Sequence, residues 1–260
     1  MNIANPAIKK INILSSDGKK LAPLTAPLIR EVFLTVKVNG EAIAKIACSG
    51  NHLKELAAGF LKSEKIINTR EEIEKIEVNH RQYAVNIILD TTKEYSGYLA
   101  GNLASSGARS RENEQPIFFP PAFKDDFVIS AATVLKLMDD LLANSVLHNK
   151  THGTHCSALA KNGTIAVVRE DIGRHNTIDM LGGHALLKQI DLATAIILTT
   201  GRISSEIVCK ILNLGIPVVI SHAAPTARAV DLARQASLTL IGYVRRGSMN
   251  IYSHERRITI

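Results

Sequence analysis

The stretch TAIILTTGRISSEIVCKILNLGIPVVIS, residues 194–221, decides the fold class. It opens with a short apolar run, continues with apolar residues at helical spacing up to Gly215, and closes with a second apolar run, IPVVIS. Short apolar runs between turn residues are typical of strands buried on both faces, and glycine is favoured just past the end of a helix. We therefore predict a buried strand, a helix and a second buried strand.

The same alternation continues on both sides of this stretch. Residues 163–170, 238–245 and 249–253 have the pattern of strands, and residues 176–189 and 224–237 have that of helices. Upstream, Ser130 is placed to cap an amphipathic helix over residues 131–146. This order predicts an open, largely parallel sheet with helices packed on it, which makes residues 126–260 an α/β domain.

Residues 1–125 predict a smaller α+β unit. Residues 31–38 and 41–49 alternate polar and apolar side chains around the turn residues Asn39 and Gly40, which indicates a hairpin. A helix with Asn51 as its N-cap is expected over residues 51–67, followed by strands over 74–78 and 83–89. Residues 96–124 are rich in Gly, Ser, Pro and charge, which predicts a long functional loop.

Composition limits the classes of function. Apolar residues make up 46% of the chain and aromatic residues 4%, so the core rests on aliphatic side chains. The net charge of +7 favours a polyanionic ligand or partner. The basic residues form short groups without a nucleic-acid-binding motif, so we expect no nucleic acid partner. No run is long enough for a signal peptide or a membrane span, which predicts a cytoplasmic protein.

Five polar segments are expected at the end of the predicted sheet where ligands bind in open α/β folds. The segments are THGTHCS (151–157), REDIGRHN (169–176), TTGRISSE (199–206), SHAAPT (221–226) and YVRRGS (243–248). In REDIGRHN, Asp171 or Glu170 is expected to orient His175 or Arg174. In TTGRISSE, Arg202 and the free amides of a helix start suit an anion. In YVRRGS, Arg245 and Arg246 beside Tyr243 suit a base and its phosphates.

Each segment also has a plainer interpretation. REDIGRHN is equally a solvated strand-to-helix connection, TTGRISSE a helix cap, and YVRRGS an exposed basic strand end. Cys156 is either a nucleophile activated by a neighbouring histidine or a small buried residue. The three cysteines have no short spacing, which indicates neither a disulfide framework nor a cysteine-rich zinc site.

Taken together, these segments resemble the FdhD family of formate dehydrogenase accessory proteins, also called sulfur carrier proteins. The resemblance covers most of the chain, and the order REDIGRHN, GRISSE, SHAAPT is its most specific part. It implies a homodimer whose second half has a three-layer, cytidine deaminase-like fold without a metal site. It also implies binding of the bis-molybdopterin guanine dinucleotide form of the molybdenum cofactor as cargo, by Tyr243, Val244, Arg245, Arg246, Gly247 and Ser248, with Arg174, His175 and Arg202 as further candidates.

The resemblance further implies sulfur transfer from a cysteine desulfurase, through a C-x-x-C pair in the long loop, to the cofactor of a molybdenum-containing formate dehydrogenase. On that pattern Ala108 and Arg111 stand at the two cysteine positions. Neither residue carries sulfur, because a persulfide needs a thiolate. Three hypotheses follow: sulfur transfer moved to Cys156, a non-catalytic cofactor-binding chaperone, and a metal-dependent deaminase-like hydrolase using His152, His155 or His175.

Overall fold

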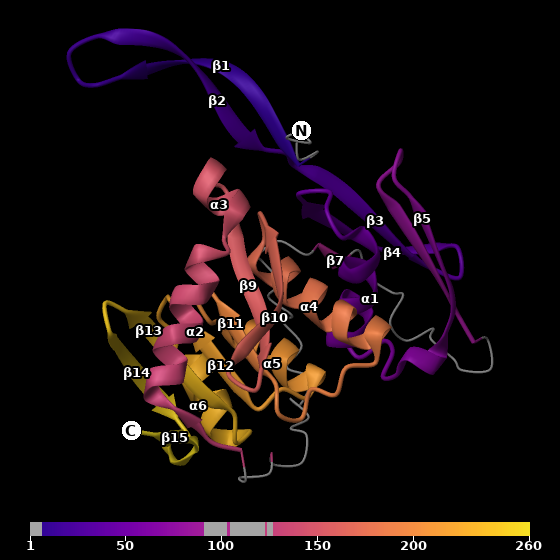
Figure 1. Cartoon of the computed structure of the whole chain (residues 1–260). Coiled ribbons are helices and arrows are strands. Elements are labelled where there is room, and N and C mark those ends of the chain that lie inside the picture. Colours follow the sequence, from indigo (N-terminus) through magenta and orange to yellow (C-terminus); the bar gives the residue numbers. More distant parts are fainter. Residues whose placement is uncertain (1–6, 91–102, 105–122, 124–126) are drawn as a thin grey trace.

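The second half of the chain is built on a six-stranded sheet in the order β10-β9-β11-β12-β13-β14 (Figure 1). The computed structural model describes residues 7–90, 103–104, 123 and 127–260. The strands are β9 (His155–Lys161), β10 (Thr164–Asp171), β11 (Ile196–Thr199), β12 (Val218–Ser221), β13 (Thr239–Arg245) and β14 (Ser248–Ser253). The α/β class is thereby confirmed.

The expectation of a largely parallel sheet is wrong, because only β11, β12 and β13 run parallel to one another. β9 pairs antiparallel with β10 and with β11, and β14 pairs antiparallel with β13. Both outer hairpins turn through two residues with positive φ, Asn162–Gly163 and Arg246–Gly247, as tight hairpins require. The missed element is β9, whose first residues carry the polar THGTHCS motif.

Helices cover both faces of this sheet, which gives three layers. α4 (Arg174–Lys188), α5 (Ser205–Leu214) and α6 (Ala227–Gln235) pack with Ile197 and Val219 on one face. α2 (Ala131–Ala143) packs with Ile196 and Val218 on the other face. Neighbouring strand residues therefore point to opposite cores, which explains the continuous apolar runs.

Short elements flank α2. β8 (Ile129–Ser130) precedes it and pairs in parallel with β15 (Ile258–Thr259). Ser130 caps α2 as predicted, because its Oγ accepts a hydrogen bond from the backbone N–H of Thr133. α3 (Val146–Thr151) follows α2, and a 3₁₀ turn (Glu255–Arg257) precedes β15.

The first half carries a second sheet in the order β5-β6-β3-β4-β7. Its elements are β3 (Val32–Val38), β4 (Glu41–Cys48), β5 (Ile73–Asn79), β6 (Ala84–Leu89), β7 (Leu103–Ala104), α1 (Leu53–Ser63) and a 3₁₀ turn (Arg70–Glu72). The predicted hairpin and the two later strands are confirmed. The predicted cap is wrong: His52, with φ 50°, is the N-cap of α1, and it makes no side-chain cap hydrogen bond. Apart from β7 and Phe123, the predicted loop over residues 96–124 lies outside the described residues.

Two glycines let α1 cross α4 at very short range. A Cβ atom on Gly59 would stand 1.6 Å from the carbonyl oxygen of Asp179, and one on Gly183 would stand 1.9 Å from that of Glu55. Only glycine fits at these positions. The crossing joins the two sheets through their helices (Figure 1). Residues 125 and 126, between which the two domains were predicted to divide, lie outside the described residues, so this division stays a prediction.

A hairpin arm of β1 (Ile8–Ser16) and β2 (Leu21–Ile29) was not predicted from the sequence. It projects from the body of the protein (Figure 1), and large apolar side chains such as Leu14 and Leu21 are exposed on it. Within the described part of the chain, no helix is long and apolar enough to cross a membrane.

Candidate functional site at one edge of the sheet

The five polar segments meet at one edge of the six-stranded sheet. Across neighbouring strands, Asp171 pairs with His155, Ser157 with Thr199, and Thr199 with Ser221. The ends of β10, β11, β12 and β13 and the beginnings of β9 and β14 therefore share this edge. THGTHCS differs from the expectation in leading into a strand instead of following one.

Hydroxyl groups fix the loop after β11. Ser157 Oγ lies 2.7 Å from Thr177 Oγ1 and 2.9 Å from Thr199 Oγ1, and Thr199 Oγ1 accepts a hydrogen bond from the N–H of Gly201. Ser221 Oγ donates to the carbonyl oxygen of Gly201 at 2.8 Å. Gly201 is thereby held from two neighbouring strands.

The two acidic residues of REDIGRHN, Glu170 and Asp171, accept hydrogen bonds mainly from backbone N–H groups. Asp171 accepts hydrogen bonds from the N–H groups of Ser49 and Gly173 and from Nδ2 of Asn176. Burial raises the pKa of Asp171, although these hydrogen bonds partly oppose the shift. Glu170 accepts from two N–H groups at the start of α3. The expectation that these acids orient His175 or Arg174 is therefore wrong, because their oxygens are directed to backbone amides and an asparagine.

Three cationic or potentially cationic groups meet around Gly201. A Cβ on Gly201 would stand 2.9 Å from Cβ of Arg174 and 3.5 Å from Nδ1 of His155. Burial and the neighbouring charge of Arg202 lower the pKa of Arg174, and Glu206 opposes this. Burial and the charge of Arg174 likewise lower the pKa of His155. Two arginines and an imidazole thus share one small region, with Glu206 near Arg174 and Asp171 opposite His155 in the strand ladder.

An unsatisfied donor marks the same place. Nε of Arg174 is buried and has no hydrogen-bond partner among the described residues. An unpaired buried N–H costs free energy, so this donor favours the arrival of an acceptor. The site therefore suits an anion with several oxygens.

His175, predicted beside Arg174, has a different environment. Its Nε2 lies 3.1 Å from Oε2 of Glu206 without the geometry of a hydrogen bond. Burial, together with the charges of Arg174 and Lys210, lowers the pKa of His175 to about 4. The ring is therefore neutral near pH 7 and adds no positive charge to the site.

The segment from Tyr243 to Ser248 forms the tip of the β13–β14 hairpin. Val244 is buried in the core, whereas the other five residues are exposed. The guanidinium carbon of Arg245 lies 3.4 Å from the centroid of the Tyr243 ring. One face of that ring is thus covered by the arginine, and Arg245 and Arg246 are exposed at the hairpin tip.

The cysteines are poorly placed for sulfur chemistry. Cys48 and Cys156 are fully buried, and burial raises the pKa of each thiol to about 12. Cys209 on α5 is partly exposed, and burial raises its pKa as well. Cys156 therefore belongs to the core, in line with the plainer interpretation of its motif. Ala108 and Arg111 lie outside the described residues.

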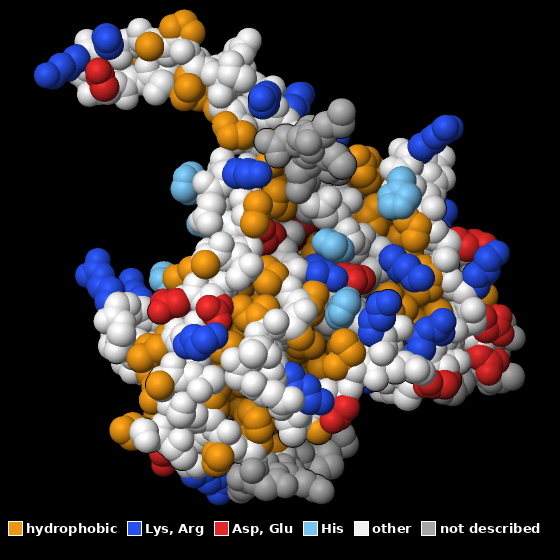
Figure 2. All heavy atoms as spheres, in the orientation of Figure 1, with side chains coloured by type: hydrophobic (Ala, Val, Ile, Leu, Met, Phe, Trp, Pro, Cys, Tyr) orange, Lys and Arg blue, Asp and Glu red, His pale blue; other side chains and the backbone are white. Residues whose placement is uncertain are grey.

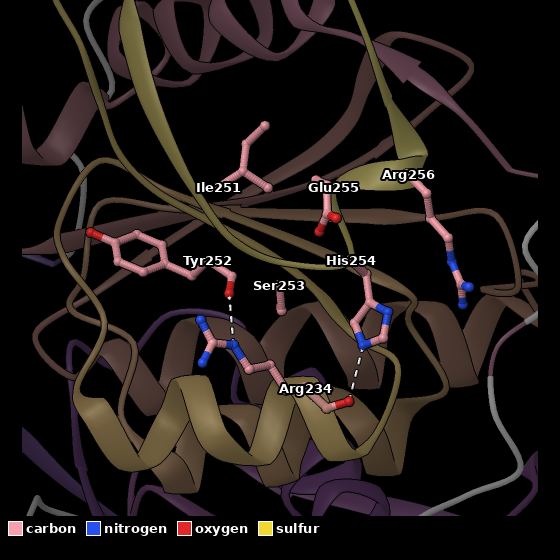
Figure 3. A pocket seen from close by; sticks show the side chains of 7 residues that line it. All are labelled: Arg234, Ile251, Tyr252, Ser253, His254, Glu255 and Arg256. Atoms are coloured by element: carbon pink, nitrogen blue, oxygen red, sulfur yellow. Dashed lines mark hydrogen bonds between the residues drawn. The ribbon is translucent and has the colours of Figure 1, made fainter.

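Among the described residues, no three His, Cys, Asp or Glu side chains form a group that could hold a metal ion. The structure therefore gives no support for metal binding. A hollow of about 400 Å³ lies at the other end of β14, beside Arg234, Tyr252 and His254 (Figure 3). There Arg234 Nε donates to the carbonyl oxygen of Tyr252, and His254 Nε2 lies 3.1 Å from the carbonyl oxygen of Arg234. These polar groups satisfy one another, so this hollow is not the candidate site.

The sequence interpretation missed His155 and Gly201 as parts of the anion site. His155 was weighed only for metal binding or nucleophile activation. The signal that would have found it is the strand beginning at His155, which places its ring at the common edge opposite Asp171. Gly201 leaves room for Arg174, because a Cβ at this position would stand 2.9 Å from the Cβ of that arginine.

The fold and the edge define a class: a three-layer α/β protein with a candidate anion site at the end of its central strands. Residues 29–259 match the FdhD/NarQ family, so the chain belongs to that family. It is 35% identical to the "Sulfur carrier protein FdhD" of Bacillus pumilus, over 98% of this chain and 99% of the relative. Identity to the protein of the same name from Bacillus subtilis is 34%, over 89% and 90% of the two chains.

A solved structure agrees with this assignment. The crystal structure of a "putative formate dehydrogenase accessory protein" from Desulfotalea psychrophila superposes with a TM-score of 0.83 at 25% sequence identity. The match covers 98% of this chain and 100% of the other.

Proposed function

We propose that this protein is an accessory protein for a molybdenum-containing formate dehydrogenase and binds the bis-molybdopterin guanine dinucleotide cofactor as cargo at the sheet edge. The observation that carries the proposal is the meeting of Arg174, Arg202 and His155 around Gly201, with a buried donor of Arg174 unsatisfied. The cofactor carries several phosphates, and arginine is the side chain best suited to bind phosphate.

The C-terminal hairpin is proposed to hold the guanine end. Arg245 and Arg246 supply donors for phosphate, and the exposed Tyr243 with its stacked Arg245 supplies a flat surface for a base. Gly247 and Ser248 complete the turn that presents them. Positive charge lies both around Gly201 and at the tip of the β13–β14 hairpin. This supports the binding of one extended polyanion along the edge.

The cysteines decide how this protein takes part in the sulfur step. Transfer of sulfane sulfur from a cysteine desulfurase needs an acceptor thiolate that the donor persulfide reaches, and it leaves the donor as a thiolate. Two of the three cysteines are buried with a raised pKa, and the third is only partly exposed. This favours the alternative in which the protein holds the cofactor, in the cytoplasm and as a homodimer, while another protein supplies the thiol.

Complementation tests the proposal. A bacterial strain that lacks its own accessory protein and shows no formate dehydrogenase activity would receive the parent gene, the Arg174→Ala variant, or the Arg81→Ala variant. Arg81 is exposed beside the distant β5–β6 turn, so it controls for the loss of one positive charge. We expect activity with the parent and with Arg81→Ala, and a strong loss with Arg174→Ala. No restoration by the parent would contradict the accessory function itself.

A further inference from the structure

A second basic pocket lies away from the sheet edge, between α1, α4 and β5. Its volume is about 470 Å³, a size typical of small-molecule sites. The lining includes six basic or imidazole side chains: His52, Lys54, Arg70, His80, His184 and Lys188. Figure 2 shows Lys, Arg and His side chains gathered over this part of the surface.

The one acid of the pocket lining is already neutralised. Both oxygens of Glu55 accept hydrogen bonds from Arg169, at 2.6 and 2.8 Å, and Oε1 also lies 2.9 Å from Nδ1 of His184. A two-point arginine–carboxylate pair of this kind holds its acid firmly. Glu55 therefore offers little compensation to Lys54 and Lys188, whereas Arg70 lies near Glu71, where hydrogen bonds lower the pKa of that carboxyl and the charge of Arg70 helps to lower it further.

The remaining cations have few partners. Arg70 uses Nη1 for the carbonyl oxygen of Ile73, which leaves its other donors for a ligand. For Lys54 and Lys188, the described residues provide no ion pair. Two exposed lysines and an arginine around one concave surface repel each other, and an anion relieves that repulsion.

The first turn of α1 also contributes positive potential to the pocket. His52, Leu53, Lys54 and Glu55 all line the pocket, and they form the N-cap and first turn of an 11-residue helix. The His52 side chain makes no cap hydrogen bond, and the positive end of the helix dipole lies at this turn.

The pocket is separate from the sheet edge. His184 and Lys188 lie ten and fourteen residues along α4 from Arg174, which is about 15 and 21 Å of helix. Leu53, Val78 and Leu187 add apolar surface to the lining. The volume exceeds what one inorganic phosphate fills, and the apolar part suits an organic body.

We propose that this pocket binds a phosphate-bearing organic anion of nucleotide size, independently of the cofactor at the sheet edge. Lys54, Arg70 and Lys188 hold the phosphates, the positive end of the α1 dipole adds to their attraction, and the apolar side chains contact the organic part. The imidazoles of His80 and His184 supply further polar contacts at the rim and the floor.

Calorimetric titration with ADP and with inorganic pyrophosphate tests the pocket in the full chain. ADP lacks guanine, so it is a poor probe for the proposed cofactor site. The double variant Lys54→Ala/Lys188→Ala should bind ADP at least about tenfold more weakly than the parent. The matched control is Lys19→Ala/Lys20→Ala, which removes the same charge from the exposed turn of the β1–β2 arm. Both double variants should keep the thermal unfolding temperature of the parent.

Three results with the parent and the two double variants would overturn the proposal. They are ADP binding that is absent in the parent, binding that survives unchanged in Lys54→Ala/Lys188→Ala, and equal weakening in both double variants, which would show attraction by overall charge only. Arg174→Ala should leave ADP binding unchanged. A loss of ADP binding in that variant alone would place the nucleotide at the sheet edge and not in this pocket.

Discussion

The ammonium group of Lys210 lies 2.8 Å from Oδ1 of Asp179, and both side chains are almost completely withdrawn from solvent. Lys210 also donates to Ser63 Oγ at 2.8 Å and lies 3.1 Å from Glu64. Burial lowers the pKa of Lys210, but the carboxylates of Asp179 and Glu64 outweigh this effect and raise it above its usual value. The cluster ties α5 to α4 and to the end of α1.

Removing this ammonium should therefore destabilise the fold strongly. Lys210→Met leaves Asp179 buried without its counter-charge, so the free energy of unfolding should fall by about 3–5 kcal/mol in urea titrations. The control is Lys136→Met, which removes an exposed helical lysine paired with Asp140 and should cost less than about 1 kcal/mol. Equal stability of the two variants would show that the buried pair contributes nothing specific.

The crossing of α1 and α4 predicts a second stability effect. Gly183→Ala drives a Cβ into the backbone of Glu55, so the free energy of unfolding should fall by about 3 kcal/mol, the upper end of the usual cost of overpacking. Gly182→Ala on the same helix meets only the end of the Leu214 side chain, which is able to rotate away. Thermal unfolding of both variants compares them, and an unperturbed Gly183→Ala protein would refute the close crossing.

His175 predicts a dependence of stability on pH. Its pKa is about 4 in the folded protein against an ordinary value of 6.5, so below pH 6.5 the unfolded chain takes up a proton that the folded chain does not. The contribution of this residue is thus present above pH 6.5 and is lost as the pH falls toward 4, by up to about 3 kcal/mol.

Urea unfolding of the parent and of His175→Asn at several pH values between 7 and 4 measures this contribution. The stability of the variant should fall less over that range than the stability of the parent. Parallel curves for the two proteins would mean that His175 titrates normally in the folded state.

The cysteines predict an order of reactivity. In the native protein, an alkylating reagent followed by mass spectrometry should modify Cys209 first and leave Cys48 and Cys156 unmodified until unfolding. After incubation with a cysteine desulfurase and cysteine, Cys156→Ala should carry as much persulfide as the parent. A persulfide found on Cys156 in the parent and lost in that variant would restore the sulfur-carrier hypothesis for this residue.

Much of this architecture was predictable, because strands 196–199 and 218–221 are buried on both faces and Gly215 ends the helix between them. The location of the candidate site was also predictable, because the loops that follow parallel strands lie at the same edge of the sheet. β9, and with it the place of His155 at the edge, was missed because a polar motif occupies the start of that strand. The α1–α4 crossing depends on Gly59 and Gly183, which lie 124 positions apart, so local pattern does not reveal that they meet.

The sheet edge is proposed to bind the guanine end and the phosphates of the cofactor. Calorimetric titration with GDP and ADP tests this assignment on the Lys54→Ala/Lys188→Ala protein, which lacks the cations of the second pocket and serves as the parent here, and on the same protein carrying Arg174→Ala, Arg245→Ala or the control Arg81→Ala. We predict that the parent prefers GDP and that each of the two edge variants binds GDP about ten- to over a hundredfold more weakly, as loss of a charged contact of about 1.5–3 kcal/mol implies. The control should bind like the parent. Equal affinity for GDP and ADP, or edge variants that bind GDP as the parent does, would contradict the assignment.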